Sequence, residues 1–163
     1  MTSCVKGFIQ VFVYGTLKRN CPNNYLLKDP NKGIAKYVCS ATTKDKYPLV
    51  VTSDYNIPFL LNKPGVGNHV SVEVYDVDQK MKDTLDELES LGVLYDLVTL
   101  DLITENSNEI HCPGYLINNC RDYMLELPMI SSYWDNEDCR YVPPHKRTGA
   151  RIALAKQVRM VSA

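Results

Sequence analysis

The sequence lacks the features that mark membrane, secreted or glycosylated proteins. No apolar run approaches the roughly 20 residues that a transmembrane helix needs. The short apolar stretch near the N-terminus is interrupted by Lys6 and Gln10, unlike the apolar region of a signal peptide. No Asn-x-Ser/Thr acceptor motif occurs. We therefore expect a cytoplasmic protein that has no membrane partner.

Cysteine and histidine are present but not in the spacing of a metal site. The six cysteines include no Cys-x-x-Cys pair, and the only adjacent Cys/His pair is His111–Cys112. A structural zinc site needs clustered ligands, so we predict no metal and no cofactor. Without an export signal, the cysteines are expected to be free thiols in a reducing compartment. They are Cys4, Cys21, Cys39, Cys112, Cys120 and Cys139.

A strong overall charge is also missing, although the charge is unevenly distributed. The 163 residues are 45% apolar and 23% charged, with a net charge of −1, as in a soluble globular protein of one domain. The chain after Asp138 carries +6, and the rest carries −7. These basic residues are spread among apolar ones, which favours a final strand or helix packed on the body, or a solvated extension. No nucleic-acid partner is predicted, because no reading module accompanies the charge.

The pattern of apolar residues predicts an α+β protein with many short strands and two or three helices. We expect a single domain over residues 1–163, with a basic segment after about residue 146. Helices are predicted at 25–27 and 78–90, the second capped by Asp78 and ending near Gly92. Residues 118–141 show no clear pattern. Strands are predicted at 8–14, 36–43, 47–51, 59–61, 70–74, 97–104 and 110–117.

The most informative motif is an apolar strand that ends in the turn Tyr14-Gly15-Thr16-Leu17. Residues 8–14 are almost wholly apolar, which is typical of a strand buried on both faces. Gly15 permits backbone angles or a close approach that a side chain would forbid. Such a turn can direct two or three N–H groups at one point, where they suit a carboxylate or a developing oxyanion. The alternative is a tight turn without function.

The helix predicted at 78–90 carries a candidate catalytic carboxylate. On a helical wheel, Met81, Leu85 and Leu88 form an apolar stripe, and Glu89 lies about 70° from its centre. A carboxylate drawn toward the interior tends to have a raised pKa. The alternative is a Glu at the edge of the stripe that reaches solvent or pairs with a lysine. The other acidic residues project more than about 100° from the stripe: Asp83, Asp86 and Glu87.

These motifs, together with others in the same order, resemble the γ-glutamylcyclotransferase-like families, most closely the γ-glutamylamine cyclotransferase branch. The resemblance covers roughly residues 8–145. The matching segments are Phe12 to Arg19 with Pro22-Asn23, Tyr47-Pro48-Leu49-Val50, Asn56-Ile57-Pro58 with Leu60-Leu61, Glu73-Val74-Tyr75-Asp76-Val77, Leu85 to Ser90 with Leu94-Tyr95, Tyr133, and Arg140-Tyr141.

The resemblance implies a fold, a reaction and a site. The fold would be a small mixed β-barrel with a few packed helices and a pocket at one end. Glu89 would be the catalytic acid/base, and Tyr14, Gly15, Thr16 and Leu17 would bind the γ-glutamyl moiety. The reaction would convert a small γ-glutamyl-amine or γ-glutamyl-amino acid to 5-oxoproline and a free amine without a cofactor, as a lyase or acyltransferase. The alternatives are a non-catalytic metabolite-binding module on the same fold, and an interaction protein that uses its basic C-terminal segment.

The chain departs from this family at a few positions. Members of the γ-glutamylamine branch tend to carry Gly and His where this chain has Asn20 and Asn24, and the shorter members have no counterpart of the segment after Lys146. Truncation there is therefore expected to spare the activity. Weaker candidates for catalytic groups are Thr16 and Cys21 as nucleophiles, and His69, His111 and His145, none of which has a motif partner.

Overall fold

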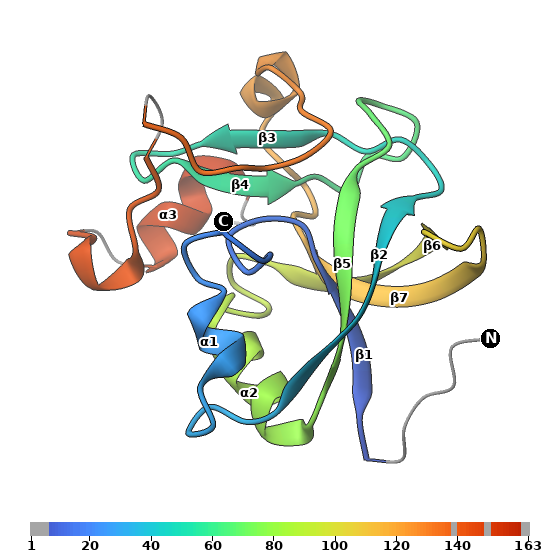
Figure 1. The fold of residues 1–163 in the computed structure, drawn as a ribbon. Helices are drawn as coiled ribbons and strands as arrows, with labels where there is room; N and C mark the ends of the chain where they lie inside the picture. The colour runs from blue at the N-terminus through green and yellow to red at the C-terminus, as the bar shows by residue number, and fades with distance from the viewer. Residues whose placement is uncertain (1–6, 138–139, 149–150, 161–163) are drawn as a thin grey trace.

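The computed structural model describes residues 7–137, 140–148 and 151–160, and it has the predicted α+β architecture (Figure 1). Each predicted strand and helix is present, with boundaries within a few residues of those expected. Two short 3₁₀ turns, Asp122–Glu126 and Pro144–Lys146, occur in the C-terminal third. The elements are β1 (Ile9–Val13), α1 (Tyr25–Lys28), β2 (Ala35–Thr43), β3 (Leu49–Thr52), β4 (Ile57–Leu60), β5 (Ser71–Val77), α2 (Gln79–Leu88), β6 (Asp96–Thr104), β7 (Glu109–Leu116) and α3 (Arg151–Val158).

The sheet curves but does not close into the expected barrel. Its order is β1-β5-β2-β6-β7, and every pair in it is antiparallel. β1 and β7 are thus its edges, and no ladder joins them in the described part of the chain. The ring of Phe12 on β1 fills the space over Gly114 on β7, where a Cβ atom would lie 2.3 Å from the ring. A side chain therefore takes the place of backbone pairing between the two edges.

The β3–β4 hairpin forms a second, two-stranded sheet above the first in Figure 1. A parallel bridge between Leu61 and Ile117 joins it to the chain just after β7. The Ile117 N–H donates to the Leu60 carbonyl at 2.9 Å, and the Asn62 N–H donates to the Ile117 carbonyl at 3.0 Å. This bridge makes the strand arrangement mixed, as predicted, and it holds the hairpin over the end of the curved sheet.

Strand β1 is buried on both faces, as its apolar sequence predicted. Val11 and Val13 pack into one apolar cluster, and Phe12 and Tyr14 pack into the other. All four side chains are at most 7% exposed. Because the strand lies between two cores, the turn that follows it at residues 14–17 is held rigidly from both sides.

Helix α2 begins and packs as expected but ends slightly earlier. The Asp78 side chain caps it, accepting hydrogen bonds from the N–H groups of Met81 at 2.8 Å and Ile34 at 3.0 Å. Met81 and Leu85 are fully buried. The helix ends at Leu88 rather than Ser90, because Ser90 adopts a left-handed conformation with φ of 48°. Glu89 is consequently the C-cap residue, where the backbone turns away from the helix axis.

The basic C-terminal segment packs on the body of the protein. Its helix α3 places Leu154, Ala155 and Val158 in the same apolar cluster as α2. Arg159, which follows the helix, forms an ion pair with Asp96 at 3.2 Å. Of the two forms that the sequence allowed, the structure has the packed one. In the described ranges, no helix is both long and apolar enough to span a membrane.

Candidate active site

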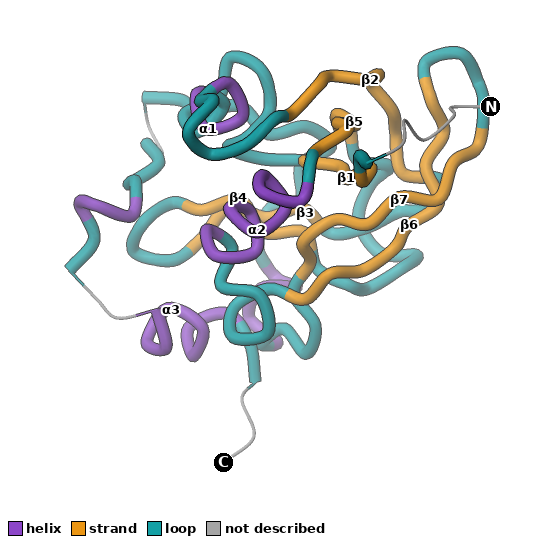
Figure 2. Tube along the Cα trace, turned by 90° about the horizontal axis from the view of Figure 1, so that it is seen from below, coloured by secondary structure: helices purple, strands orange, loops and turns teal. Residues whose placement is uncertain are grey.

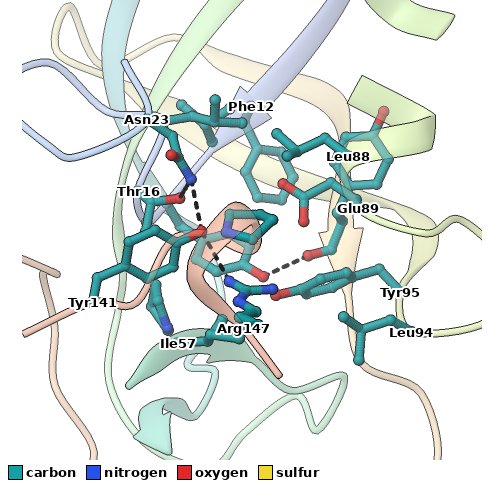
Figure 3. A pocket seen from close by; sticks show the side chains of 17 residues that line it. Phe12, Thr16, Asn23, Ile57, Leu88, Glu89, Leu94, Tyr95, Tyr141 and Arg147 are labelled. Carbon is teal, nitrogen blue, oxygen red and sulfur yellow. Dashed lines mark hydrogen bonds between the residues drawn. The ribbon is translucent and has the colours of Figure 1, made fainter. Parts of the chain in front are cut away.

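A pocket at the end of β1 brings together all five residues predicted from the sequence (Figure 3). One wall is the turn of Tyr14, Gly15, Thr16 and Leu17, and a second wall is formed by Leu88 and Glu89 at the end of α2. The apolar part of the lining includes Ile57 and Pro58 of β4 and the loop residues Leu94 and Tyr95. A further wall comes from three residues in the last quarter of the chain, Tyr141, Pro144 and Arg147. The pocket therefore joins segments from both ends and the middle of the chain.

Glu89 is a partly buried carboxyl group that points into this pocket. Burial raises the pKa of the carboxyl group from 4.5 to about 7, while the positive charge of Arg147 opposes that shift. No described residue forms a hydrogen bond or ion pair with the carboxyl oxygens. A carboxyl group with a pKa near neutrality exchanges a proton readily at cellular pH, which suits general acid/base chemistry.

The other carboxylates of α2 confirm most of the wheel analysis, with one exception. Asp83 and Glu87 are exposed, as predicted. Asp86 was expected to face outward but is partly buried, because it accepts hydrogen bonds from the Tyr115 hydroxyl at 2.6 Å and from Lys82 at 2.5 Å. The prediction for Asp86 is therefore wrong. Tyr115 of β7 and Lys82, one turn earlier on α2, hold the Asp86 carboxylate inward. A helical wheel drawn for α2 alone cannot show a contact with β7.

The turn at residues 14–17 lines the pocket with backbone as well as side-chain atoms. Gly15 is required for a close approach, because a Cβ atom there would lie 2.7 Å from Pro58 Cγ. The Tyr14 hydroxyl donates to the Tyr115 carbonyl at 2.7 Å and fixes the start of the turn. Among the residues that the structure describes, none accepts a hydrogen bond from the N–H of Gly15, Thr16 or Leu17. These N–H groups are thus available to a ligand.

Two asparagines that depart from the family pattern are compatible with the same turn. Asn20 has φ of 65°, a left-handed conformation that Gly and Asn adopt at low cost. Asn24 donates from its side chain to the Leu17 carbonyl at 2.9 Å. The departures therefore leave the geometry of the turn intact, and Asn24 holds its last residue in place.

Arg147 and Tyr141 are pocket residues that the sequence analysis did not assign to the site. The Tyr141 hydroxyl accepts hydrogen bonds from Asn23 Nδ2 at 2.9 Å and from Arg147 Nη2 at 3.0 Å. Asn23 Nδ2 also donates to Thr16 Oγ1 at 2.9 Å, so a chain of polar contacts joins the turn to the C-terminal segment (Figure 3). Tyr141 was part of the family resemblance, but nothing in the sequence distinguished Arg147 from the other basic residues of the tail.

The weaker candidates do not form a catalytic group. Thr16 Oγ1 lies in the pocket but accepts from Asn23, and no base adjoins it in the described ranges. Cys21 is buried outside the pocket lining, and burial raises the pKa of its thiol, which is the opposite of activation. His69, His111 and His145 are also absent from the pocket lining. No cluster of three or more potential metal ligands occurs within the described ranges, and Cys4 and Cys139 lie outside them.

Comparison with known proteins shows the family to which this chain belongs. A family model described as gamma-glutamyl cyclotransferase, AIG2-like, matches residues 11–136. The chain is 41% identical over 140 residues to the Troponin C-akin-1 protein of Drosophila melanogaster, covering 85% of this chain and 84% of the relative. It is 38% identical over 140 residues to the gamma-glutamylaminecyclotransferase of Bos taurus, covering 84% and 83%.

A solved structure has the same fold. The crystal structure of an AIG2-like protein from Mus musculus superposes with a TM-score of 0.80 at 33% identity, covering 86% of this chain and 99% of that chain. The matched residues of the family model include the turn and Glu89, whereas Tyr141, Pro144 and Arg147 lie beyond them. The resemblance read from the motifs is thus confirmed over most of the chain, which belongs to the gamma-glutamyl cyclotransferase, AIG2-like family of enzymes.

Proposed function

We propose that this protein is an intramolecular cyclotransferase that converts a γ-glutamyl-amine or γ-glutamyl-amino acid to 5-oxoproline and the free amine. The main observation that supports this proposal is the position of Glu89. Its carboxyl group, with a pKa of about 7, shares one pocket with the open N–H groups of the turn. The names of the family and of several relatives support the same type of activity.

The proposed reaction needs one proton carrier and one oxyanion site. The α-amino nitrogen of the substrate attacks its own γ-carbonyl carbon, and the Glu89 carboxylate takes a proton from that nitrogen. The bond from the γ-carbon to the leaving nitrogen then breaks, and Glu89 returns the proton to the leaving amine. The products are the five-membered lactam and the amine. The reaction therefore consumes no water and needs no oxidant or cofactor.

The turn is suited to hold the substrate in the reactive conformation. The N–H groups of Gly15, Thr16 and Leu17 are candidates to stabilise the oxygen of the tetrahedral intermediate. Because the attack is intramolecular, binding the substrate in a bent conformation contributes much of the rate acceleration. The apolar walls around Ile57, Leu88 and Leu94 exclude water and strengthen these polar contacts.

The test is to incubate the protein with a panel of γ-glutamyl compounds and to measure 5-oxoproline formation. We expect at least one γ-glutamyl-amine or γ-glutamyl-amino acid to be converted, with equimolar release of the amine. Each assay is repeated after exhaustive chelation, which should leave turnover unchanged. Specific binding of γ-glutamyl compounds without any 5-oxoproline would contradict the proposal and favour the non-catalytic binding module.

A further inference from the structure

Arg147 is held in a fixed orientation at the edge of the pocket. Its guanidinium lies over the rings of Tyr55 and Tyr141, with centroid distances of 5.2 Å and 5.5 Å. Nε donates to the Val142 carbonyl at 3.0 Å, and Nη2 donates to the Tyr141 hydroxyl at 3.0 Å. Two aromatic faces and two hydrogen bonds thus restrict the side chain, which lowers the entropic cost of binding a ligand.

The charge of Arg147 has no acidic partner among the described residues. No carboxylate oxygen in those residues lies within 4.0 Å of the guanidinium, although five lysine or arginine side chains in the same residues pair with a carboxylate. Within the described lining of the pocket, Arg147 is the one basic side chain and Glu89 is the one acidic side chain. The two share the pocket without pairing, which leaves a site where a negatively charged group would be stabilised (Figure 3).

We propose that Arg147 is a specificity-determining residue that binds a carboxylate of the substrate. This inference rests on the proposed function, because it assigns one subsite of the same pocket. The planar fork of a guanidinium matches a carboxylate, and Nη1 of Arg147 forms no hydrogen bond with another described residue. Every γ-glutamyl compound carries a carboxylate on its α-carbon, and a γ-glutamyl-amino acid carries a second one on its leaving group.

The polar contacts around Arg147 link this subsite to the turn. Arg147, Tyr141, Asn23 and Thr16 form one chain of hydrogen bonds from the C-terminal segment to the turn. A carboxylate held by Arg147 is therefore positioned relative to the N–H groups that face the γ-carbonyl. The same positive charge lowers the pKa of Glu89 against the effect of burial, so Arg147 also influences the ionisation of the acid/base.

The first arm of the test measures binding of the product by calorimetry, with and without its carboxylate. We expect the wild-type protein to bind 5-oxoproline about 10- to 100-fold more tightly than 2-pyrrolidinone, the same lactam without the carboxylate. Arg147→Gln should remove this preference, and Arg147→Lys should retain part of it. The matched control is Lys146→Gln, which removes the same charge at the adjacent, exposed position and should retain the preference.

The second arm identifies the source of the carboxylate. If Arg147 contacts the leaving group instead, Arg147→Gln should leave 5-oxoproline binding unchanged. It should then raise KM about 10- to 100-fold for γ-glutamyl-amino acids but not for γ-glutamyl-alkylamines. A further readout is the acidic limb of the pH profile of kcat/KM, which should move to higher pH in Arg147→Gln because Glu89 loses a stabilising charge.

The outcomes separate this inference from the proposed function. If Arg147→Gln loses the preference for the ligand that carries the carboxylate in either arm, the inference is supported. The arm in which the loss occurs identifies which carboxylate Arg147 binds. Wild-type turnover, with no effect of the ligand carboxylate in either arm, overturns the inference and leaves the cyclotransferase intact. Absence of turnover with every γ-glutamyl compound overturns the proposed function itself. A preference that is unchanged in folded Arg147→Gln, in both arms, also overturns the inference. If Arg147→Gln fails to fold, Arg147→Lys is used for the same comparison.

Discussion

The pocket has an acidic side, formed by Glu89, and a basic side, formed by Arg147. The two residues lie in segments of very different regularity. Glu89 ends an amphipathic helix whose buried stripe predicted its direction, and it lies inside the segment that the family model matches. Arg147 follows a three-residue 3₁₀ turn beyond that match, in a segment with no periodicity. A regular element can thus reveal a candidate functional side chain through its own periodicity. The position of a side chain in an irregular segment depends instead on contacts with residues far away in the sequence.

The two sides also act on each other. Burial favours the protonated form of Glu89, and the guanidinium of Arg147 favours the ionised form. The resulting pKa of about 7 lies above that of an exposed carboxyl group, because the effect of burial outweighs that of Arg147. Removing the charge of Arg147 should therefore raise the pKa of Glu89.

The largest effect is expected on the acidic side. Glu89→Gln preserves size and hydrogen-bonding capacity but removes proton transfer, so kcat for 5-oxoproline formation should fall about 10²- to 10⁴-fold. The control is Glu87→Gln, an exposed position two residues earlier that should change kcat little. Near-normal turnover of Glu89→Gln, or an equal loss in Glu87→Gln, would show that the acid/base has been assigned wrongly.

On the basic side, truncation after Lys146 removes both the charge of Arg147 and the apolar residues of α3. The sequence alone suggested that a chain ending at Lys146 would keep its activity, but the structure places Arg147 in the pocket and Leu154, Ala155 and Val158 in the core. We expect the truncation to lower the free energy of unfolding by about 3–6 kcal/mol and to impair turnover. Thermal unfolding and the 5-oxoproline assay measure both effects.

The control for this truncation is a chain ending at Met160, which retains α3 and should resemble the full-length protein. Unchanged stability and turnover in the chain ending at Lys146 would restore the expectation from the sequence. That result would also count against a role for Arg147 in the site.

A smaller effect is expected at the junction of the two sides. Tyr141→Phe removes the hydroxyl that accepts from both Asn23 and Arg147. The loss should raise KM by about 5- to 10-fold, with a smaller change in kcat, because one hydrogen-bonded link is typically worth about 1 kcal/mol. Tyr123→Phe is a suitable control, since its hydroxyl bonds to the Gln157 carbonyl at the surface. Equal kinetics for the two variants would mean that the link does not position the substrate.

The last expected effect concerns the dependence of stability on pH rather than activity. The pKa of Glu89 rises from 4.5 to about 7 on folding, so the folded protein keeps a proton that the unfolded chain has lost. The contribution of Glu89 to stability is therefore full below about pH 4.5 and is lost as the pH rises through 7. Glu89→Gln does not ionise, so relative to the wild-type protein it should gain about 1–3 kcal/mol between pH 4 and pH 8.

Denaturant unfolding at the two pH values measures this gain. A stabilised but inactive variant is the combination expected of a catalytic carboxyl group held in a costly environment. A variant that is less stable than the wild-type protein at pH 8 would instead indicate that Glu89 holds the structure together.

Several features of the fold were predictable because they depend on residues close together in the chain. The burial of β1 on both faces followed from its apolar run, and the start of α2 followed from the cap at Asp78. The end of α2 was placed two residues too late, because the left-handed conformation of Ser90 has no strong signal in a serine. The inward position of Asp86 was missed because Tyr115, its partner, lies on β7.

By itself the sequence determined the two motifs of the site: the strand that ends in the turn at residues 14–17, and the helix that directs Glu89 toward the interior. Both depend on local propensity and periodicity, which act between near neighbours. Only the tertiary structure decided that the two motifs meet in one pocket, that the sheet stays open at Phe12 and Gly114, and that Arg147 joins the site. These features depend on packing between residues far apart in the chain. For example, Asn23 and Tyr141 are 118 positions apart, and no local sequence pattern predicts their contact.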